Sequence, residues 1–165
     1  MRLKHAVAVA ALALSSLGAA HASQTWAWSY SGTGVVASGT LTTAGAALVP
    51  EDILAITGSR NGLAITGLVP LDTDINFLYD NQFTSVGASF SDGGMVFSVA
   101  GGQPNVNVYF FDGSYTDLYI DGANAVETAI SWNVSAVPEP STALAMLAGL
   151  GLLGVAVRRR VSDAA

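Results

Sequence analysis

The chain has no cysteine, and charged residues of any kind are scarce in it. Without cysteine it cannot form a disulfide framework, a thiolate zinc site or a thiol nucleophile. Residues 23–137 also lack histidine and lysine, and Arg60 is their only basic residue. These absences exclude a serine–histidine triad, a histidine metal site and a lysine Schiff base as they are normally built. Ten carboxylates against one arginine leave this stretch with a net charge of −9, which disfavours nucleic acid as a partner.

The residues that are present divide the chain into two ends and a middle. All 14 aromatic residues lie in residues 23–137, whereas five of the six basic residues lie outside it. A chain of 165 residues that is 51% hydrophobic and 11% charged is long and apolar enough to fold as one domain. The ends and the middle are therefore interpreted separately.

Residues 1–22 have the organisation of a secretory signal peptide. A short basic start is followed by a nearly continuous apolar run, Ala6–Leu17, and by Ala20 and Ala22, the small residues of a cleavage site. The apolar run is too short to span a bilayer comfortably, which makes an uncleaved anchor the weaker alternative. We predict that the mature chain begins at Ser23.

The C-terminal segment combines a proline-rich start, an apolar run and a basic cluster. Val137-Pro138-Glu139-Pro140 comes first, and its prolines fix the backbone in an extended form. Ala143–Val157 is uncharged, and as a helix of about 22 Å it spans a bilayer only marginally. Arg158-Arg159-Arg160 follows, and the positive-inside rule places it and residues 161–165 in the cytoplasm. Residues 23–136 are then expected on the other side of the membrane.

The order of these three parts resembles the PEP-CTERM sorting signal of Gram-negative bacteria, over 137–160. The resemblance implies recognition by an exosortase, which is a membrane peptidase, and cleavage near Pro138-Glu139-Pro140. It also implies transient anchoring in the inner membrane, followed by release or transfer to the cell surface. Such proteins occur in bacteria that make exopolysaccharide and biofilm, so exopolysaccharide is a further expected partner.

The middle reads as an all-β domain. Short runs rich in β-branched and aromatic residues alternate with glycine, asparagine and aspartate, as strands and turns do. Eight to ten such runs at close spacing predict an antiparallel sandwich or a small barrel. The strands are expected at Trp26–Tyr30, Val35–Thr42, Leu54–Gly58, Leu63–Gly67, Val86–Phe90, Met95–Val99, Val106–Phe111, Tyr115–Ile120 and Thr128–Val134.

Two pairings follow from local signals. Asn61-Gly62 separates two copies of Leu-Ala-Ile-Thr-Gly and predicts a type I′ hairpin, because both of its central positions need positive φ. That register pairs Arg60 with Leu63, Gly58 with Ile65 and Ile56 with Gly67, and it places Leu54, Ile56, Leu63 and Ile65 on one face. The first and last strands both carry tryptophan, so they are expected to pair and close the sheet.

Residues 26–111 also resemble a glycine-rich ectodomain that is common in PEP-CTERM proteins. The resemblance rests on Trp28–Gly34, Ala37–Leu41, Ile56–Gly58 with Arg60-Asn61-Gly62, Asp80-Asn81, Gly87–Phe90 and Asn107–Phe110. It implies no established activity.

The middle offers few residues for chemistry. A carboxylate pair could hydrolyse glycosides, with candidates at Glu51, Asp52, Asp72, Asp74, Asp80 and Asp117. Residues 72–76 alternate oxygen ligands but continue with Phe77, where an EF-hand has glycine, so only a weak calcium site of another kind is considered. Trp26, Trp28, Tyr30 and Trp132 are expected in the core rather than on a sugar-stacking platform.

The sequence therefore favours a non-enzymatic surface or biofilm-matrix protein without a cofactor. The alternatives are a carbohydrate- or calcium-binding module and, third, a carboxylate-dependent glycoside hydrolase.

Overall fold

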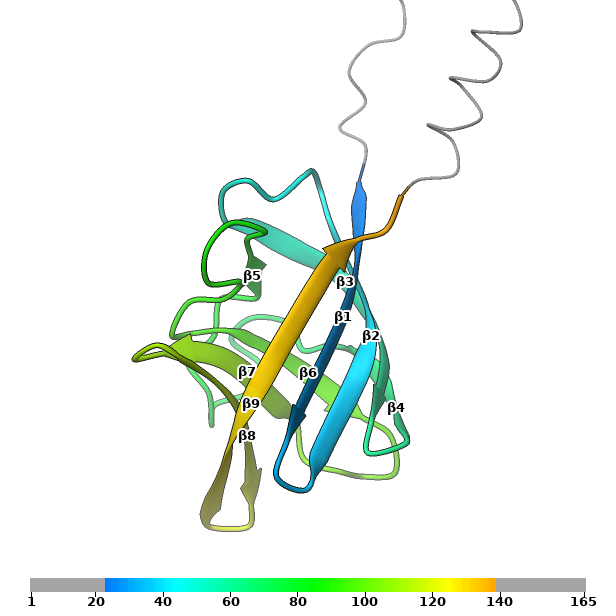
Figure 1. The fold of residues 1–165 in the computed structure, drawn as a ribbon. Helices are drawn as coiled ribbons and strands as arrows, with labels where there is room; N and C mark the ends of the chain where they lie inside the picture. Colours follow the sequence, from blue (N-terminus) through cyan, green and yellow to red (C-terminus); the bar gives the residue numbers. More distant parts are fainter. Residues whose placement is uncertain (1–22, 139–165) are drawn as a thin grey trace, which may run out of the picture.

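The computed structural model describes residues 23–138, and within them it contains strands and no helix. These described residues form nine strands, most of them at the predicted positions (Figure 1). Their bounds are β1 Gln24–Gly32, β2 Val35–Thr43, β3 Glu51–Arg60, β4 Leu63–Leu68, β5 Gln82–Phe83, β6 Met95–Val99, β7 Val106–Phe111, β8 Ser114–Asp121 and β9 Asn124–Ala136.

Eight of these strands close into an antiparallel barrel. Their order is β2-β1-β9-β8-β7-β6-β4-β3, and β3 pairs with β2 to complete the ring, while the short β5 adds to β3. Of the two predicted architectures the barrel is thus the observed one. The pairing of the first and last strands is confirmed, since Tyr30 lies opposite Trp132 in the β1–β9 ladder. The Trp28 and Trp132 rings stack at 5.6 Å between centroids.

Side chains that alternate along the strands fill the barrel. On β1, Trp26, Trp28 and Tyr30 are 7%, 3% and 3% exposed, which confirms that these rings belong to the core. Facing strands contribute Leu41, Phe97 and Val108, which are fully buried. A barrel of eight strands is just wide enough for side chains to fill, and large aromatic rings do so here.

The Asn61-Gly62 turn is confirmed, but the hairpin around it opens earlier than predicted. Both turn residues have positive φ, 50° and 80°. Arg60 pairs with Leu63 and Ser59 with Ala64, and the β3–β4 ladder ends there. The predicted pairs of Gly58 and Ile56 with β4 do not form, because β3 continues along β2 while β4 turns to β6. The two strands therefore splay apart above the turn.

The predicted shared face of the hairpin is correct only in part. Ile56 and Ile65 are buried, whereas Leu54 is 59% exposed and Leu63 41% exposed. Leu54 is the extra residue of a β-bulge, because Thr42 pairs with Ala55 and Thr43 with Ile53. A bulge shifts the alternation by one residue, and Ile53 takes the inward place expected for Leu54.

Residues 82–91 pack where β3 and β4 are no longer paired with each other. β5 pairs with the start of β3, and Phe83 packs against Trp26 at 5.2 Å between centroids. Phe90 meets Trp132 edge to face at 4.8 Å. The strand predicted at Val86–Phe90 is wrong: these residues form bends, and Phe90 enters the core from a loop.

Candidate functional site

The two ends of the barrel differ in a way that bears on function. β1 begins and β9 ends side by side at one end, which we call the chain-exit end (Figure 1). The opposite end, the turn end, carries the turns at residues 33–34, 61–62 and 122–123.

Within residues 23–138, the last hydrogen bonds between the C-terminal end and the barrel are made by Val137. Its amide donates a hydrogen bond of 2.8 Å to the carbonyl of Thr25, and its carbonyl accepts one of 3.1 Å from the Gln24 side chain. β9 also runs to Ala136, two residues further than the predicted end at Val134. Pro138 follows and is exposed. The fold therefore holds the chain up to Val137 and presents the first proline of Pro138-Glu139-Pro140 to solvent.

The PEP-CTERM protein-sorting motif matches residues 136–160 of this chain. The chain carries a PEP-CTERM sorting motif. Such a motif implies an exported protein that is membrane-anchored before processing, and that an exosortase, itself a membrane protein, sorts to the cell surface. No curated protein and no solved structure was found to match the chain. The resemblance of residues 26–111 to a PEP-CTERM ectodomain stays a prediction.

Several predicted site residues lie outside the described part of the chain. These are Ala20 and Ala22 of the cleavage site, Glu139 and Pro140 of the sorting signal, the apolar run 143–157, and Arg158, Arg159 and Arg160. Ser23, Val137 and Pro138 are described. Among residues 23–138 there is no helix of the length and hydropathy that a membrane span requires.

Sequence reasoning missed a buried ion pair in the barrel lumen. Asp117 on β8 is fully buried, and its carboxylate accepts hydrogen bonds from Arg60 Nη2 at 2.6 Å and Nε at 2.9 Å. The hydroxyl of Tyr30 donates a third, at 2.5 Å. β3, β8 and β1 are thus tied across the lumen. The available signal was that Asp117 shares the inward positions of β8 with Tyr115 and Tyr119, and that Arg60 is the only cation in the domain.

Burial and charge set the protonation of this cluster. Burial would lower the pKa of Arg60, but the hydrogen bonds and the charge of Asp117 raise it, so the guanidinium stays charged. Burial, followed by the charge and hydrogen bond of Asp117, raises the pKa of Tyr30 far above its ordinary value, and Arg60 offsets only part of this. The cluster is therefore an ion pair capped by a neutral phenol.

A pH dependence follows from Tyr30. In the unfolded chain tyrosine ionises near pH 10, whereas the folded protein keeps Tyr30 protonated at that pH. The folded state then binds more protons, so stability is intact below about pH 10 and falls by up to about 1.4 kcal/mol per pH unit above it. The midpoint of urea unfolding, measured below and above pH 10, should show this fall in stability. In Tyr30→Phe the fall between the two pH values should be smaller. An identical slope in both proteins would contradict the assignment.

In the loop considered as a weak calcium site, Asp74 is bonded to amide groups of Asn76 and Asn105. The Asp74 carboxylate accepts hydrogen bonds from Asn105 Nδ2 at 2.8 Å, from Asn76 Nδ2 at 2.9 Å and from the Asn76 amide at 3.0 Å. Burial opposes its ionisation, but these bonds outweigh burial and lower the pKa of Asp74. In the described residues no group of three or more His, Cys, Asp or Glu side chains is placed to hold a metal ion.

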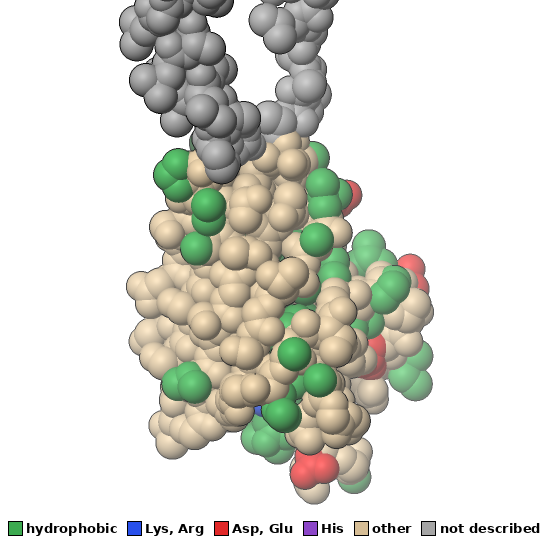
Figure 2. Space-filling model, turned by 90° about the vertical axis from the view of Figure 1, so that its right-hand side faces the viewer, with side chains coloured by type: hydrophobic (Ala, Val, Ile, Leu, Met, Phe, Trp, Pro, Cys, Tyr) green, Lys and Arg blue, Asp and Glu red, His purple; other side chains and the backbone are tan. Residues whose placement is uncertain are grey.

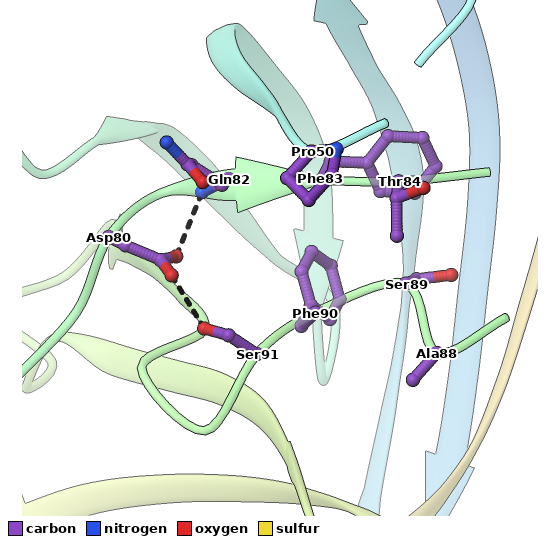
Figure 3. A pocket seen from close by; sticks show the side chains of 9 residues that line it. All are labelled: Pro50, Asp80, Gln82, Phe83, Thr84, Ala88, Ser89, Phe90 and Ser91. Atoms are coloured by element: carbon purple, nitrogen blue, oxygen red, sulfur yellow. Dashed lines mark hydrogen bonds between the residues drawn. The ribbon is translucent and has the colours of Figure 1, made fainter. Parts of the chain in front are cut away.

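A hollow of about 180 Å³ lies beside β5 (Figure 3). Phe83 and Phe90 line it, and Asp80 stands at its edge. The Asp80 carboxylate accepts hydrogen bonds from the Ser91 hydroxyl at 2.6 Å and from the Gln82 amide at 3.0 Å. Asp80 is the one carboxylate among the residues that line this hollow, so the lining does not supply the facing pair that glycoside hydrolysis requires.

Proposed function

We propose that this protein is a non-enzymatic surface or matrix protein, delivered by exosortase cleavage at Pro138-Glu139-Pro140. The observation that carries the proposal is the position of Val137. Its two hydrogen bonds end the folded barrel one residue before the exposed Pro138. A membrane peptidase can therefore reach the motif while the barrel stays folded.

The interior of the barrel supports a structural role for the domain. The lumen is occupied by Trp28, Tyr30 and Phe97 and is closed near the turn end by the Arg60–Asp117 pair. Because side chains fill the lumen, the barrel is a rigid body and its interior is not shaped to hold a ligand. Such a body is compatible with a structural role at the cell surface or in a biofilm matrix, and association with exopolysaccharide belongs to this proposal.

The orientation in the membrane is also part of the proposal. Arg158, Arg159 and Arg160 follow the apolar run directly, and the positive-inside rule retains such a cluster in the cytoplasm. The barrel then lies on the periplasmic side of the inner membrane before cleavage. Removal of the signal peptide at Ser23 completes the mature N-terminus.

The decisive variant combines Pro138→Ala with Glu139→Ala. It removes the rigid backbone and the charge of the motif and leaves the contacts of Val137 in place. We expect a folded barrel whose full-length form accumulates in the membrane fraction. The measurement is cell fractionation together with mass spectrometry of the released C-terminus.

A matched control replaces one proline and one glutamate elsewhere in the domain, Pro104→Ala with Glu127→Ala. This control should be released normally. The proposal fails if the motif variant is released at the rate of the control and with the same C-terminus. Deleting the exosortase should reproduce the retention seen in the motif variant.

A further inference from the structure

Among the described residues, four of the ten large hydrophobic side chains that are exposed belong to segments at the chain-exit end. Thr43 pairs both with Gln24 and with Ile53, so the loop 44–50 between β2 and β3 lies at this end. Figure 2 shows hydrophobic side chains close to the point where the chain leaves the barrel. We define the chain-exit patch as Leu48, Val49, Leu54 and Val86, which are 70%, 65%, 59% and 60% exposed.

The loop 44–50, which carries Leu48 and Val49, is fixed by hydrogen bonds to the segment that carries Val86. The carbonyl of Ala47 accepts hydrogen bonds from the Ser85 amide at 2.8 Å, the Ser85 hydroxyl at 3.0 Å and the Thr84 hydroxyl at 3.1 Å. These bonds place Val86 beside the loop. Ala47 is fully buried and has a φ of 47°, a left-handed conformation that costs a non-glycine residue about 1–2 kcal/mol. The fold keeps that strain while Leu48 and Val49 face solvent.

Single exposed aliphatic residues need no explanation, whereas several that lie together can form a contact surface. Ala47 and Ile53, which flank the patch in sequence, already fill the core. Leu54 faces outward only because of the bulge in β3. The four patch residues therefore lie outside the core, and their apolar side chains are available for a contact.

Chain length identifies what lies opposite the patch. Val137 is bonded to the barrel, and five residues, 138–142, separate it from the apolar run that begins at Ala143. Six steps of at most about 3.6 Å limit this tether to about 22 Å. The precursor is membrane-anchored, and the headgroup layer adds several ångströms on each side of the hydrocarbon. The chain-exit end therefore stays within about 22 Å of the start of the anchored apolar run, which puts the membrane surface within reach of the patch.

Charge indicates the kind of contact. The domain carries ten carboxylates and one arginine, with Glu51 and Asp52 at the chain-exit end itself. An anionic surface repels such a domain, so attraction must come from apolar contact.

We propose that the chain-exit patch docks on the membrane in which the precursor is anchored, with Leu48, Val49, Leu54 and Val86 inserted among the lipid headgroups. The proposal rests on the anchored precursor of the proposed function. Docking holds the barrel upright and fixes Pro138 at the membrane surface, where a membrane peptidase acts. After cleavage the small patch alone holds the barrel only weakly, so the same contact permits release.

The absence of cysteine makes a direct test possible. Full-length Val86→Cys carries a polarity-sensitive fluorophore and is reconstituted in phosphatidylcholine vesicles that contain lipids with quenchers on the acyl chains. We expect blue-shifted emission and strong quenching. The matched site is Val36→Cys, which is 58% exposed at the turn end, about 25 Å away by strand rise. The fluorophore at position 36 should show the emission of a water-exposed probe, and the lipid quencher should not reduce its intensity.

A second variant separates docking from simple tethering. Leu48→Ser with Val49→Ser, in the Val86→Cys background, should lower the docked-to-undocked ratio about tenfold. Leu63→Ser with Val36→Ser removes the same two residue types at the turn end and should leave the quenching of Val86→Cys unchanged. Replacing part of the phosphatidylcholine by phosphatidylglycerol should weaken the quenching.

Three results would overturn the proposal. One is equal quenching at positions 86 and 36, and another is undiminished quenching at 86 after Leu48→Ser with Val49→Ser. The third is shielding of position 86 that ignores the lipid quencher and grows with the protein-to-lipid ratio, since a second copy would then cover the patch. Vesicle flotation separates the failure of the proposed function from the failure of docking. A chain that does not float with vesicles contradicts the anchored precursor. A chain that floats while the fluorophore at position 86 remains in water contradicts docking alone.

Discussion

Replacing Asp117 by alanine is expected to destabilise the barrel by about 3–5 kcal/mol. The substitution removes all three acceptor contacts of the carboxylate and leaves the Arg60 guanidinium in the lumen, where its side chain is only 14% exposed. A buried charge without its partner loses solvation and gains nothing in return. Urea unfolding followed by tryptophan fluorescence measures the loss, because Trp28 and Trp132 lie in the same core.

A double variant tests whether the loss comes from the stranded charge. Arg60→Met with Asp117→Leu removes both charges and fills the space with apolar side chains, which in other buried pairs is close to neutral. It should be more stable than Asp117→Ala, a non-additivity that a double-mutant cycle measures. Asp121→Ala, an exposed aspartate at the end of the same strand, should cost within about 0.5 kcal/mol. If Asp117→Ala behaves like Asp121→Ala, the ion pair does not hold the barrel together.

The parts of the fold that were predictable are those fixed by local chemistry. Positive φ at Asn61 and Gly62 follows from their residue types, and the alternation of Trp26, Trp28 and Tyr30 follows from the period of a strand. Unlike these local features, the pairing of β1 with β9 joins distant parts of the sequence; it was inferred from the tryptophan on each strand, and the structure confirms it. The sorting motif was readable because it is a linear pattern.

The missed parts depend on partners far away in the sequence. The β3–β4 hairpin opens because β2, β5 and β6 compete for its edges, and no residue in the hairpin signals this. Arg60 and Asp117 are 57 residues apart, so their pairing depends on the closed ring. The bonds of Val137 to Thr25 and Gln24 likewise appear only once the barrel is built, because β1 and β9 lie at opposite ends of the domain sequence.

The second large effect is expected at Gly39, where β2 and β3 leave no room for a side chain. This residue pairs with Gly58 in the β2–β3 ladder. A Cβ at Gly39 would overlap the carbonyl oxygen of Thr57, and a Cβ at Gly58 would overlap that of Ser38. Gly58 also has a φ of 141°, which other residues rarely adopt. The two glycines thus let the backbones of β2 and β3 meet where the barrel closes.

Gly39→Ala is therefore expected to cost about 3–5 kcal/mol, because the obstacle is backbone and cannot rotate away. Urea midpoints measure the cost, and far-UV circular dichroism shows whether the β structure persists. Gly34→Ala is the control: its φ is 74°, and a Cβ there would meet nothing within 4 Å, so it should cost only about 1–2 kcal/mol of backbone strain. Equal losses in the two variants would mean that β2 and β3 can separate at Gly39 without penalty, and that the ring does not depend on their contact there.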